Sequence, residues 1–165
     1  MFEYRTAETL EGESDDGLFV ICDRIQDTHN FGAILRCCDA LGAQAVIVGE
    51  SGQSRVTPQV ARSSAGAVNF VPIVLAESLL DCVLQLKNAG VKIVAGSEHS
   101  DSEVWSADLT GSVALIIGNE AEGIAQDLLE QCDTRVRVPM LGQVSSLNAS
   151  VAAGILLYEI SRQRS

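Results

Sequence analysis

The sequence predicts a single α/β domain with a mostly parallel sheet and helices on both faces. Three observations support this fold class. Apolar runs such as residues 113–117 are continuous rather than alternating, which is typical of strands buried on both faces of a parallel sheet. Segments with apolar residues at helical spacing separate these runs. The 165 residues, 47% of them hydrophobic, suffice for one domain with its own core.

The domain is expected to begin at residue 18 and to include residues 18–165. Residues 1–17 are expected to form a flexible acidic tail or linker, because the stretch is polar and contains glycine. Five of its acidic residues lie close together within residues 8–16: Glu8, Glu11, Glu13, Asp15 and Asp16.

In the first half of the domain, strands and helices alternate. The expected order is a strand at 18–22, a helix at 29–41, a strand at 45–48, a helix at 54–65 and a strand at 71–74. Gly42 is placed to end the first helix, because glycine adopts the left-handed conformation that closes many helices. Pro58 lies near the start of the second helix, where proline is tolerated. Pro72 lacks an N–H donor and therefore favours the edge or the end of a strand.

The second half continues the alternation. The expected order is a helix at 78–88, strands at 91–95 and 113–117, a helix at 124–132, a strand at 134–138 and a helix at 147–162. Gly90 is placed to cap the first of these helices. A polar loop at 96–111 holds the only tryptophan, Trp105. Ser145 and Ser146, both good N-cap residues, are expected to start the last helix.

The composition excludes several classes of protein. No uninterrupted apolar segment is long enough to span a membrane, and the N-terminus lacks a signal-peptide core, so a cytoplasmic protein without membrane contact is expected. The five cysteines are an odd number without a C-x-x-C pair, and there are only two histidines. This pattern predicts reduced, structural thiols and neither a metal site nor a disulfide framework.

The net charge of −11 by itself argues against a nucleic-acid partner. Much of the acid is local to the N-terminus, however, and nine of the eleven basic residues are arginines, which suit bidentate phosphate contacts. The candidates for phosphate contact are Arg24, Arg55, Arg62, Arg135 and Arg137, although an exposed arginine is ordinarily only a solvated charge.

Three polar clusters interrupt apolar segments, and each lies at a junction where α/β proteins bind polar ligands. The first is residues 29–36. Within it, Gly32 allows close backbone approach, and Asn30 can orient a hydroxyl or cap the helix. Arg36 can hold a phosphate, or it can pair with an acid and serve structure alone.

The second cluster, residues 118–123, runs from a buried strand into a loop bounded by Gly118 and Gly123. It is not a G-x-G-x-x-G motif, which disfavours a dinucleotide and an oxidoreductase. Glu120 is either a site acid or a first-turn carboxylate favoured by the helix dipole.

The third cluster, residues 136–150, passes from a strand through Pro139 and Gly142 to the last helix. Ser145, Ser146 and Asn148 are more than one cap requires. A serine nucleophile is not expected, because there is no G-x-S-x-G elbow. Three such junctions in one small domain suggest one composite site.

Together the clusters resemble the three motifs of the SpoU (TrmH-type) RNA ribose 2′-O-methyltransferases, within the SPOUT superfamily. Residues 30–36 fit N-x-G-x-x-x-R, residues 118–123 fit G-N-E-x-x-G, and residues 138–150 fit V-P-M-x-G-x-x-x-S-L-N-x-S, with Ala149 where valine is usual. The similarity covers residues 18–163, and the three motifs in this order are far more specific than any one of them.

The resemblance implies a deep trefoil knot formed by the last strand, loop and helix, a feature that is rare among proteins. It also implies the cofactor S-adenosylmethionine, placed against Gly118, Val138 and Leu147, with Gly96 and Met140 nearby. Apolar side chains would sandwich the adenine while loop backbone groups bind its edge.

The implied reaction is methyl transfer to a ribose 2′-hydroxyl of ribosomal or transfer RNA, without a metal. The family pattern assigns the central role to Arg36 as a base; stabilising charge and orienting a phosphate is chemically easier for a guanidinium. Asn30 and Asn148 would position Arg36 or the ribose. Glu120 and Ser146 would hold the arginine and the loop.

The family forms homodimers whose active site draws on both subunits. The last helix suits this, because it is more apolar than one buried face requires; a fully buried core helix is the alternative. The residues concerned are Val151, Ala152, Ala153, Ile155, Leu156 and Leu157.

Two other functions remain open. One is a non-catalytic RNA- or cofactor-binding module of the same fold, and the other is a small-molecule methyltransferase or another α/β enzyme. Many relatives that modify ribosomal RNA carry an added N-terminal RNA-binding domain, for which this sequence shows only residues 1–17. The target RNA and nucleotide cannot be read from the sequence.

Overall fold

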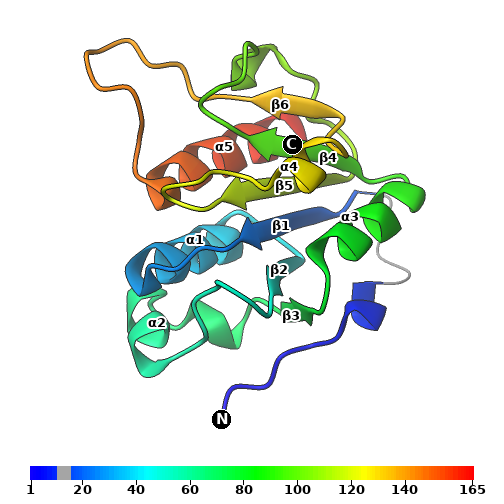
Figure 1. Cartoon of the computed structure of the whole chain (residues 1–165), viewed down its shortest axis with the longest axis vertical. Helices are drawn as coiled ribbons and strands as arrows, with labels where there is room; N and C mark the ends of the chain where they lie inside the picture. Colours follow the sequence, from blue (N-terminus) through cyan, green and yellow to red (C-terminus); the bar gives the residue numbers. More distant parts are fainter. Residues whose placement is uncertain (11–15) are drawn as a thin grey trace.

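A computed structural model describes residues 1–10 and 16–165. Within this part of the chain, six strands form one sheet in the order β3-β2-β1-β5-β4-β6, and every pairing between neighbours is parallel (Figure 1). The strands are β1 Leu18–Asp23, β2 Ala45–Gly49, β3 Ile73–Ala76, β4 Lys92–Gly96, β5 Val113–Gly118 and β6 Thr134–Val136. The α/β class and the parallel sheet are therefore confirmed. The trefoil knot stays a prediction.

The two faces of the sheet bury separate clusters of apolar residues, which explains why most residues of the strands are apolar. Along β1, Leu18, Val20 and Cys22 enter one cluster, together with residues of α1 and α5. Phe19 and Ile21 enter the other, together with residues of α3 and α4. Helices therefore cover both faces, as expected (Figure 1).

Five α-helices connect or follow these strands within the described residues: α1 Thr28–Ala40, α2 Pro58–Ser63, α3 Leu79–Asn88, α4 Gln126–Leu129 and α5 Ala149–Gln163. Three short 3₁₀-helices accompany them: η1 Ala7–Leu10, η2 Ala67–Asn69 and η3 Val104–Ser106. None of these helices is both long and apolar enough to cross a bilayer.

Helix ends differ from the sequence prediction where side chains or distant contacts set them. The helix expected at 54–65 starts only at Pro58, because Thr57 caps it by accepting the N–H of Val60. The last helix is capped by Asn148, whose Oδ1 accepts the N–H groups of Ser150 and Val151, so Ser145 and Ser146 are not its caps. That part of the prediction is wrong.

The proline and glycine predictions agree with the structure. Pro72 directly precedes β3, which is an edge strand. Gly42 and Gly90 follow α1 and α3 with φ of 78° and 86°, the left-handed conformation expected of closing glycines.

The first ten residues pack against the domain. The backbone of Arg5 bonds to β3 through Arg5 N–Ile73 O at 2.8 Å and Leu75 N–Arg5 O at 2.9 Å. Leu10 is buried in the cluster with Phe19. This segment therefore covers an otherwise open sheet edge. Of the acidic residues that suggested a flexible tail, Glu11, Glu13 and Asp15 lie outside the described residues, and the domain boundary at residue 17 stays a prediction.

Gly32 brings α1 into contact with α2. A Cβ added at Gly32 would lie 1.8 Å from Ser63 Oγ and 2.9 Å from the backbone nitrogen of Ser64. The close approach expected at this glycine thus serves helix packing.

Gly32→Ala is expected to lower the free energy of unfolding by about 2–3 kcal/mol, because the added methyl overpacks this contact. Urea unfolding followed by circular dichroism measures it. The double variant Gly32→Ala/Ser63→Gly should recover only part of the loss, since the contact with the Ser64 backbone remains. Gly154→Ala is the control, because a Cβ there meets only Cys37 Sγ, at 3.2 Å. An unchanged stability of Gly32→Ala would contradict the packing argument.

Candidate functional site

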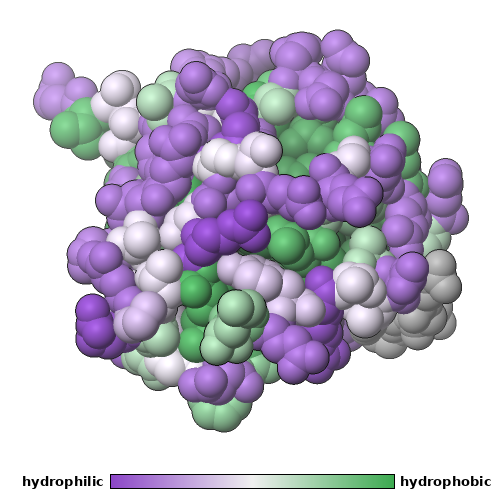
Figure 2. Space-filling view, turned by 60° about the horizontal axis from the view of Figure 1, so that its bottom comes forward, coloured by the Kyte–Doolittle hydropathy of each residue, from purple (hydrophilic) through white to green (hydrophobic). Residues whose placement is uncertain are grey.

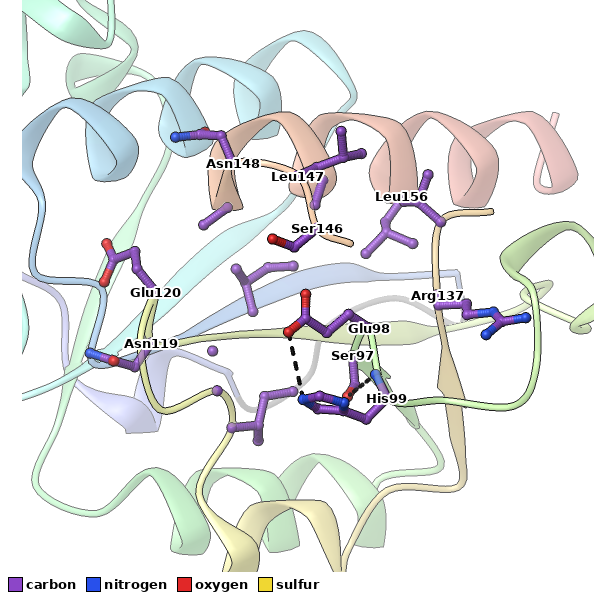
Figure 3. Close-up of a pocket in the computed structure, with 18 of the residues that line it drawn as sticks. Ser97, Glu98, His99, Asn119, Glu120, Arg137, Ser146, Leu147, Asn148 and Leu156 are labelled. Carbon is purple, nitrogen blue, oxygen red and sulfur yellow. Dashed lines mark hydrogen bonds and ion pairs between the residues drawn. The ribbon is translucent and has the colours of Figure 1, made fainter. Parts of the chain in front are cut away.

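A cavity of about 550 Å³ opens at the carboxyl ends of three neighbouring strands. Gly96 of β4, Gly118 of β5 and Val136 of β6 line it, together with the loops that follow these strands and the start of α5 (Figure 3). This is the edge at which parallel sheets bind ligands, because loops converge there and offer free backbone groups.

A chain of hydrogen bonds joins one residue from each polar cluster at the cavity. Asn148 Nδ2 donates to Asn30 Oδ1 at 2.9 Å, and Asn30 Nδ2 donates to Glu120 Oε1 at 3.4 Å. In the sequence, Asn148 is 118 positions from Asn30, and Glu120 is 90 positions from Asn30. All three residues line the cavity. The three clusters therefore meet at one place, as the composite-site hypothesis requires.

The start of α1 holds the Glu120 carboxylate. Its oxygens accept the backbone N–H groups of Asp27 at 3.3 Å and Gln26 at 3.5 Å. Asp27 caps α1 by accepting the N–H of Asn30. A carboxylate at a helix N-terminus is favoured by the helix dipole and the free N–H groups. Glu120 is thus a cavity residue; it lies in a loop six residues before α4, so the alternative of a carboxylate in the first turn of its own helix is wrong, and the helix N-terminus that it contacts is that of α1.

The residues predicted to surround S-adenosylmethionine all lie on the cavity wall: Gly96, Gly118, Val138, Met140 and Leu147. Ser146 lines it as well, and Ile117 and Leu156 add apolar surface (Figure 3). Gly118 is essential to the shape, because a Cβ there would lie 2.5 Å from the backbone of both Gly123 and Ile124.

The loop before α5 also carries backbone donors without protein partners. Among the described residues, no backbone N–H from 138 to 147 donates to a protein acceptor, and five residues of this segment line the cavity: Val138, Met140, Ser145, Ser146 and Leu147. Polar backbone groups of this kind need a partner, which in a cavity is water or a ligand. The loop can therefore bind the polar edge of a planar ligand while Val138, Leu147 and Leu156 cover its faces.

Arg36 lies apart from the other predicted catalytic residues. It is exposed on α1 and is not among the residues that line the cavity. Within the part of the chain that the structure describes, it pairs with no carboxylate. The described residues therefore do not show the structural alternative for Arg36, an ion pair with a neighbouring acid.

The sequence did not predict a network of hydrogen bonds and ion pairs around Asp23 and Arg24 that holds the second cluster in place. Asp23, buried at the end of β1, accepts Arg24 Nε at 2.9 Å and the backbone N–H of Ala125 at 2.7 Å. Arg24 also bonds to Glu122 at 2.5 Å, and its carbonyl accepts Asn119 Nδ2 at 2.8 Å. The hydrogen bond to Asp23 raises the pKa of Arg24 above its usual value. Arg24, a phosphate candidate, is thus committed to carboxylates.

Asp23→Asn is expected to lower the free energy of unfolding by about 2 kcal/mol, because it removes the charge from a buried ion pair but keeps the shape. Asp23 has 4% of its side chain exposed, and Glu122, the second partner of Arg24, has 70%. Glu122→Gln should therefore cost less than about 1 kcal/mol. Urea unfolding of both variants measures the difference. Equal losses of unfolding free energy would show that the burial of the carboxylate does not determine the strength of its ion pair with Arg24.

Burial also governs the thiol nearest the site. Cys22, next to Asp23, has its pKa raised to about 12 by burial first and then by the carboxylates of Asp23 and Glu120. The thiol therefore stays protonated and packs as a small apolar side chain. All five cysteines are free.

A second missed group comes from the loop after β4. Ser97, Glu98 and His99 line the cavity, and His99 Nε2 lies 3.5 Å from Glu98 Oε1 (Figure 3). The loop lacks periodicity, so the sequence offered no signal beyond the end of an apolar strand at Gly96.

Comparisons with known proteins show which proteins this chain is similar to. The sequence profile of the SpoU rRNA Methylase family matches residues 17–158. The 23S rRNA (guanosine-2′-O-)-methyltransferase RlmB of Pseudomonas putida is 38% identical over 162 residues, which are 98% of this chain and 65% of the relative. The chain thus spans slightly less than two thirds of that relative's length.

Solved structures show the same fold. The SpoU methyltransferase AviRb of Streptomyces viridochromogenes, crystallised with AdoMet, superposes with a TM-score of 0.83 at 38% identity, covering 92% of this chain and 59% of that one. The TrmH/SpoU tRNA modifying enzyme of A. aeolicus superposes with a TM-score of 0.81 at 34% identity, covering 95% of this chain and 79% of that one.

Proposed function

Because the chain belongs to the SpoU rRNA methylase family, we propose that it transfers a methyl group from S-adenosylmethionine to a ribose 2′-hydroxyl of RNA. The observation that carries the proposal is the hydrogen-bond chain from Asn148 through Asn30 to Glu120, which joins the three motif clusters at the wall of one cavity. The relatives that resemble the chain over almost its whole length are named for this chemistry.

The cavity suits S-adenosylmethionine. Its volume of about 550 Å³ lies within the range of roughly 300–1,000 Å³ usual for small-molecule sites. Gly118 lets the backbone come close to a ligand, the unpaired N–H groups after Val138 can bind the adenine edge, and Leu147 can cover its face. When bound, the cofactor supplies an electrophilic methyl group on a sulfonium.

The chain's residues would position and activate the ribose. The 2′-oxygen forms a bond to the methyl carbon, the carbon–sulfur bond breaks, and the hydroxyl proton leaves to a base or to solvent. Asn30 and Asn148 have amide groups at the cavity rim that can orient the hydroxyl. Ser146 can bond to the loop or the ligand. Arg36 would hold a neighbouring phosphate and stabilise the developing charge, which a guanidinium does more easily than it accepts a proton.

The site is proposed to be completed by a second copy of the chain. Val151, Ile155 and Tyr158 form an exposed apolar stripe along one side of α5, at spacings of four and three residues. The adjoining loop exposes Leu141 and Val144. A monomer would leave this stripe in water, while a two-fold contact between copies would bury it beside the part of α5 that lines the cavity, at Ala149, Ala152 and Leu156.

Ile155→Glu is expected to convert a dimer to a monomer and to reduce methyl transfer by at least about tenfold, because a charge placed in an apolar interface is left unpaired. Light scattering during size-exclusion chromatography measures the mass. Leu84→Glu on α3 is a matched control, since Leu84 and Ile155 have exposed fractions of 37% and 39%. A monomeric wild-type chain, or an Ile155→Glu variant that stays dimeric, would contradict the interface.

The proposed substrate is ribosomal or transfer RNA, which would place the activity in the cytoplasm. The test is methyl transfer from tritiated S-adenosylmethionine to unmodified 23S ribosomal RNA and to bulk transfer RNA, followed by mapping of the modified nucleotide. Label in a 2′-O-methylnucleoside is the expected result. Label in a base, or binding of both ligands without transfer, would replace the proposal with base methylation or with the non-catalytic module.

A further inference from the structure

The chain carries a net charge of −11, yet its basic residues are sorted into two groups. Six of the eleven lie within ion-pair distance of a carboxylate: Arg24, Lys87, Lys92, Arg137, Arg162 and Arg164. Among the described residues the other five have no carboxylate partner: Arg5, Arg36, Arg55, Arg62 and Arg135. Only the second group is available to a new anion without first losing an internal partner.

Three of these five arginines belong to one part of the fold. Arg36 lies on α1, Arg62 on α2, and Arg55 in the loop before α2, and all three are exposed. Among the described residues, the guanidinium of Arg55 donates only to the backbone carbonyl of Glu50. The acid that lies nearest to Arg36 along α1, Asp39, forms no ion pair with it.

Direct contacts hold α1 and α2 side by side (Figure 1). Ser63 Oγ donates to Thr28 O at 3.1 Å, and Gln59 Nε2 lies 3.1 Å from His29 Nε2. His29 and Arg36 are seven residues apart and therefore share one side of α1, while Gln59 and Arg62 are three apart on α2. We call this surface the α1–α2 arginine face, made of His29, Arg36, Arg55, Gln59 and Arg62.

The face adjoins the cavity. Asn30, the residue after His29, lines the cavity and bonds to Asn148. Figure 2, in which the lower part of Figure 1 is turned toward the viewer, shows hydrophilic residues over much of this side of the molecule, with apolar areas between them. A strand of RNA with one ribose at Asn30 can continue from the cavity onto the α1–α2 arginine face, because His29 and Asn30 are adjacent in α1.

We propose that the α1–α2 arginine face binds the phosphates that flank the target nucleotide. This inference rests on the proposed function, since it identifies where the RNA of that reaction lies. Exposed guanidiniums without carboxylate partners can each take a phosphate in a bidentate contact. The acidic remainder of the molecule repels RNA, so the strand is steered to this face. An acidic chain can thus gain affinity for RNA without a basic overall charge.

The test compares Arg55→Gln/Arg62→Gln with Arg135→Gln. Arg135 is also exposed and without a carboxylate partner, but it lies on β6, at the sheet edge opposite to β3. The probe is a fluorescent single-stranded RNA of twenty nucleotides, and its affinity is measured by anisotropy between 50 and 300 mM salt. Arg36 is left unchanged, so that the catalytic role proposed for it does not enter.

Each lost phosphate contact reduces the slope of log affinity against log salt by about 0.7 for single strands. The double variant should therefore lose about 1.4 in slope and about tenfold in affinity near 150 mM salt, while Arg135→Gln matches the wild type and all variants bind S-adenosylmethionine equally. A wild-type slope in the double variant, or the same loss in Arg135→Gln, would overturn the inference.

Methyl transfer is measured separately on the same proteins. If the wild type transfers no methyl group but the slope changes as expected, the proposed function fails and the RNA face stands. If transfer occurs and the double variant has the KM and salt slope of the wild type, RNA binding by the α1–α2 arginine face is contradicted, while the proposed methyl transfer is supported.

Discussion

Arg36→Ala is expected to abolish methyl transfer, with a loss of about a thousandfold or more, while S-adenosylmethionine binding stays nearly unchanged. The side chain is exposed on α1 and lines no part of the cavity, so its removal leaves the cofactor walls and the helix packing intact. Its proposed contribution, stabilisation of charge on the ribose and its phosphate, is made only in the transition state.

Calorimetric titration of S-adenosylmethionine and single-turnover methyl transfer separate binding from chemistry. Arg135→Ala removes another exposed arginine, which lies on β6, and should match the wild type. Equal losses of binding and transfer in Arg36→Ala would contradict the role given to this residue.

Arg36→Lys distinguishes the two chemical roles. If Arg36 only supplies charge, lysine keeps part of the rate and the pH profile does not change, because both groups stay protonated near neutrality. If it acts as a base, the rate of the lysine variant rises with pH toward the lysine pKa of about 10.4. We expect the first result, since a guanidinium hardly loses its proton in a protein.

The parallel sheet could be predicted because most of its strands are buried on both faces, whereas the order of the strands was not predicted. Each of the six expected strands is present, and Pro72 favoured an edge or end position for β3 for a local reason, its missing N–H donor. Helix ends were less predictable because distant residues set them. The helix expected at 124–132 is only Gln126–Leu129. The residue just before it, Ala125, donates its backbone N–H to Asp23, which lies 102 positions away in the sequence.

The site was predictable where polar residues interrupt apolar patterns, as at Asn30, Glu120 and Asn148. Asp23 was missed because one acid at the end of a strand looks like the start of a loop; its partners become visible only in the fold. The last helix shows the same limit on a smaller scale. Serine and asparagine are both good N-cap residues, so local preference alone could not select Asn148 over Ser145 and Ser146. Asn148 also bonds to Asn30 at the cavity wall.

Gly118→Ala is expected to eliminate measurable S-adenosylmethionine binding, a loss of at least about a hundredfold. The two atoms nearest to the added Cβ, at 2.5 Å, are backbone atoms of Gly123 and Ile124, so no side chain can move aside to relieve the contact. The loop that carries Asn119 and Glu120 must shift, and the cavity floor and the Asn30–Glu120 contact shift with it.

Gly96→Ala is the matched comparison, because Gly96 lies at the end of the neighbouring strand and also lines the cavity. Its added Cβ would meet Leu156 Cδ1 at 2.7 Å, the end of a side chain that can adopt another rotamer, and backbone only at 3.4 Å. Gly96→Ala should therefore weaken cofactor binding by only about tenfold and leave the loop of the second cluster, residues 118–123, in place. Calorimetric titration measures both affinities, and protection of residues 118–125 from hydrogen exchange reports on the loop. If Gly118→Ala binds the cofactor as well as Gly96→Ala does, the backbone contact at Gly118 does not shape the site, and the fit of the cofactor to this cavity must be argued from other residues.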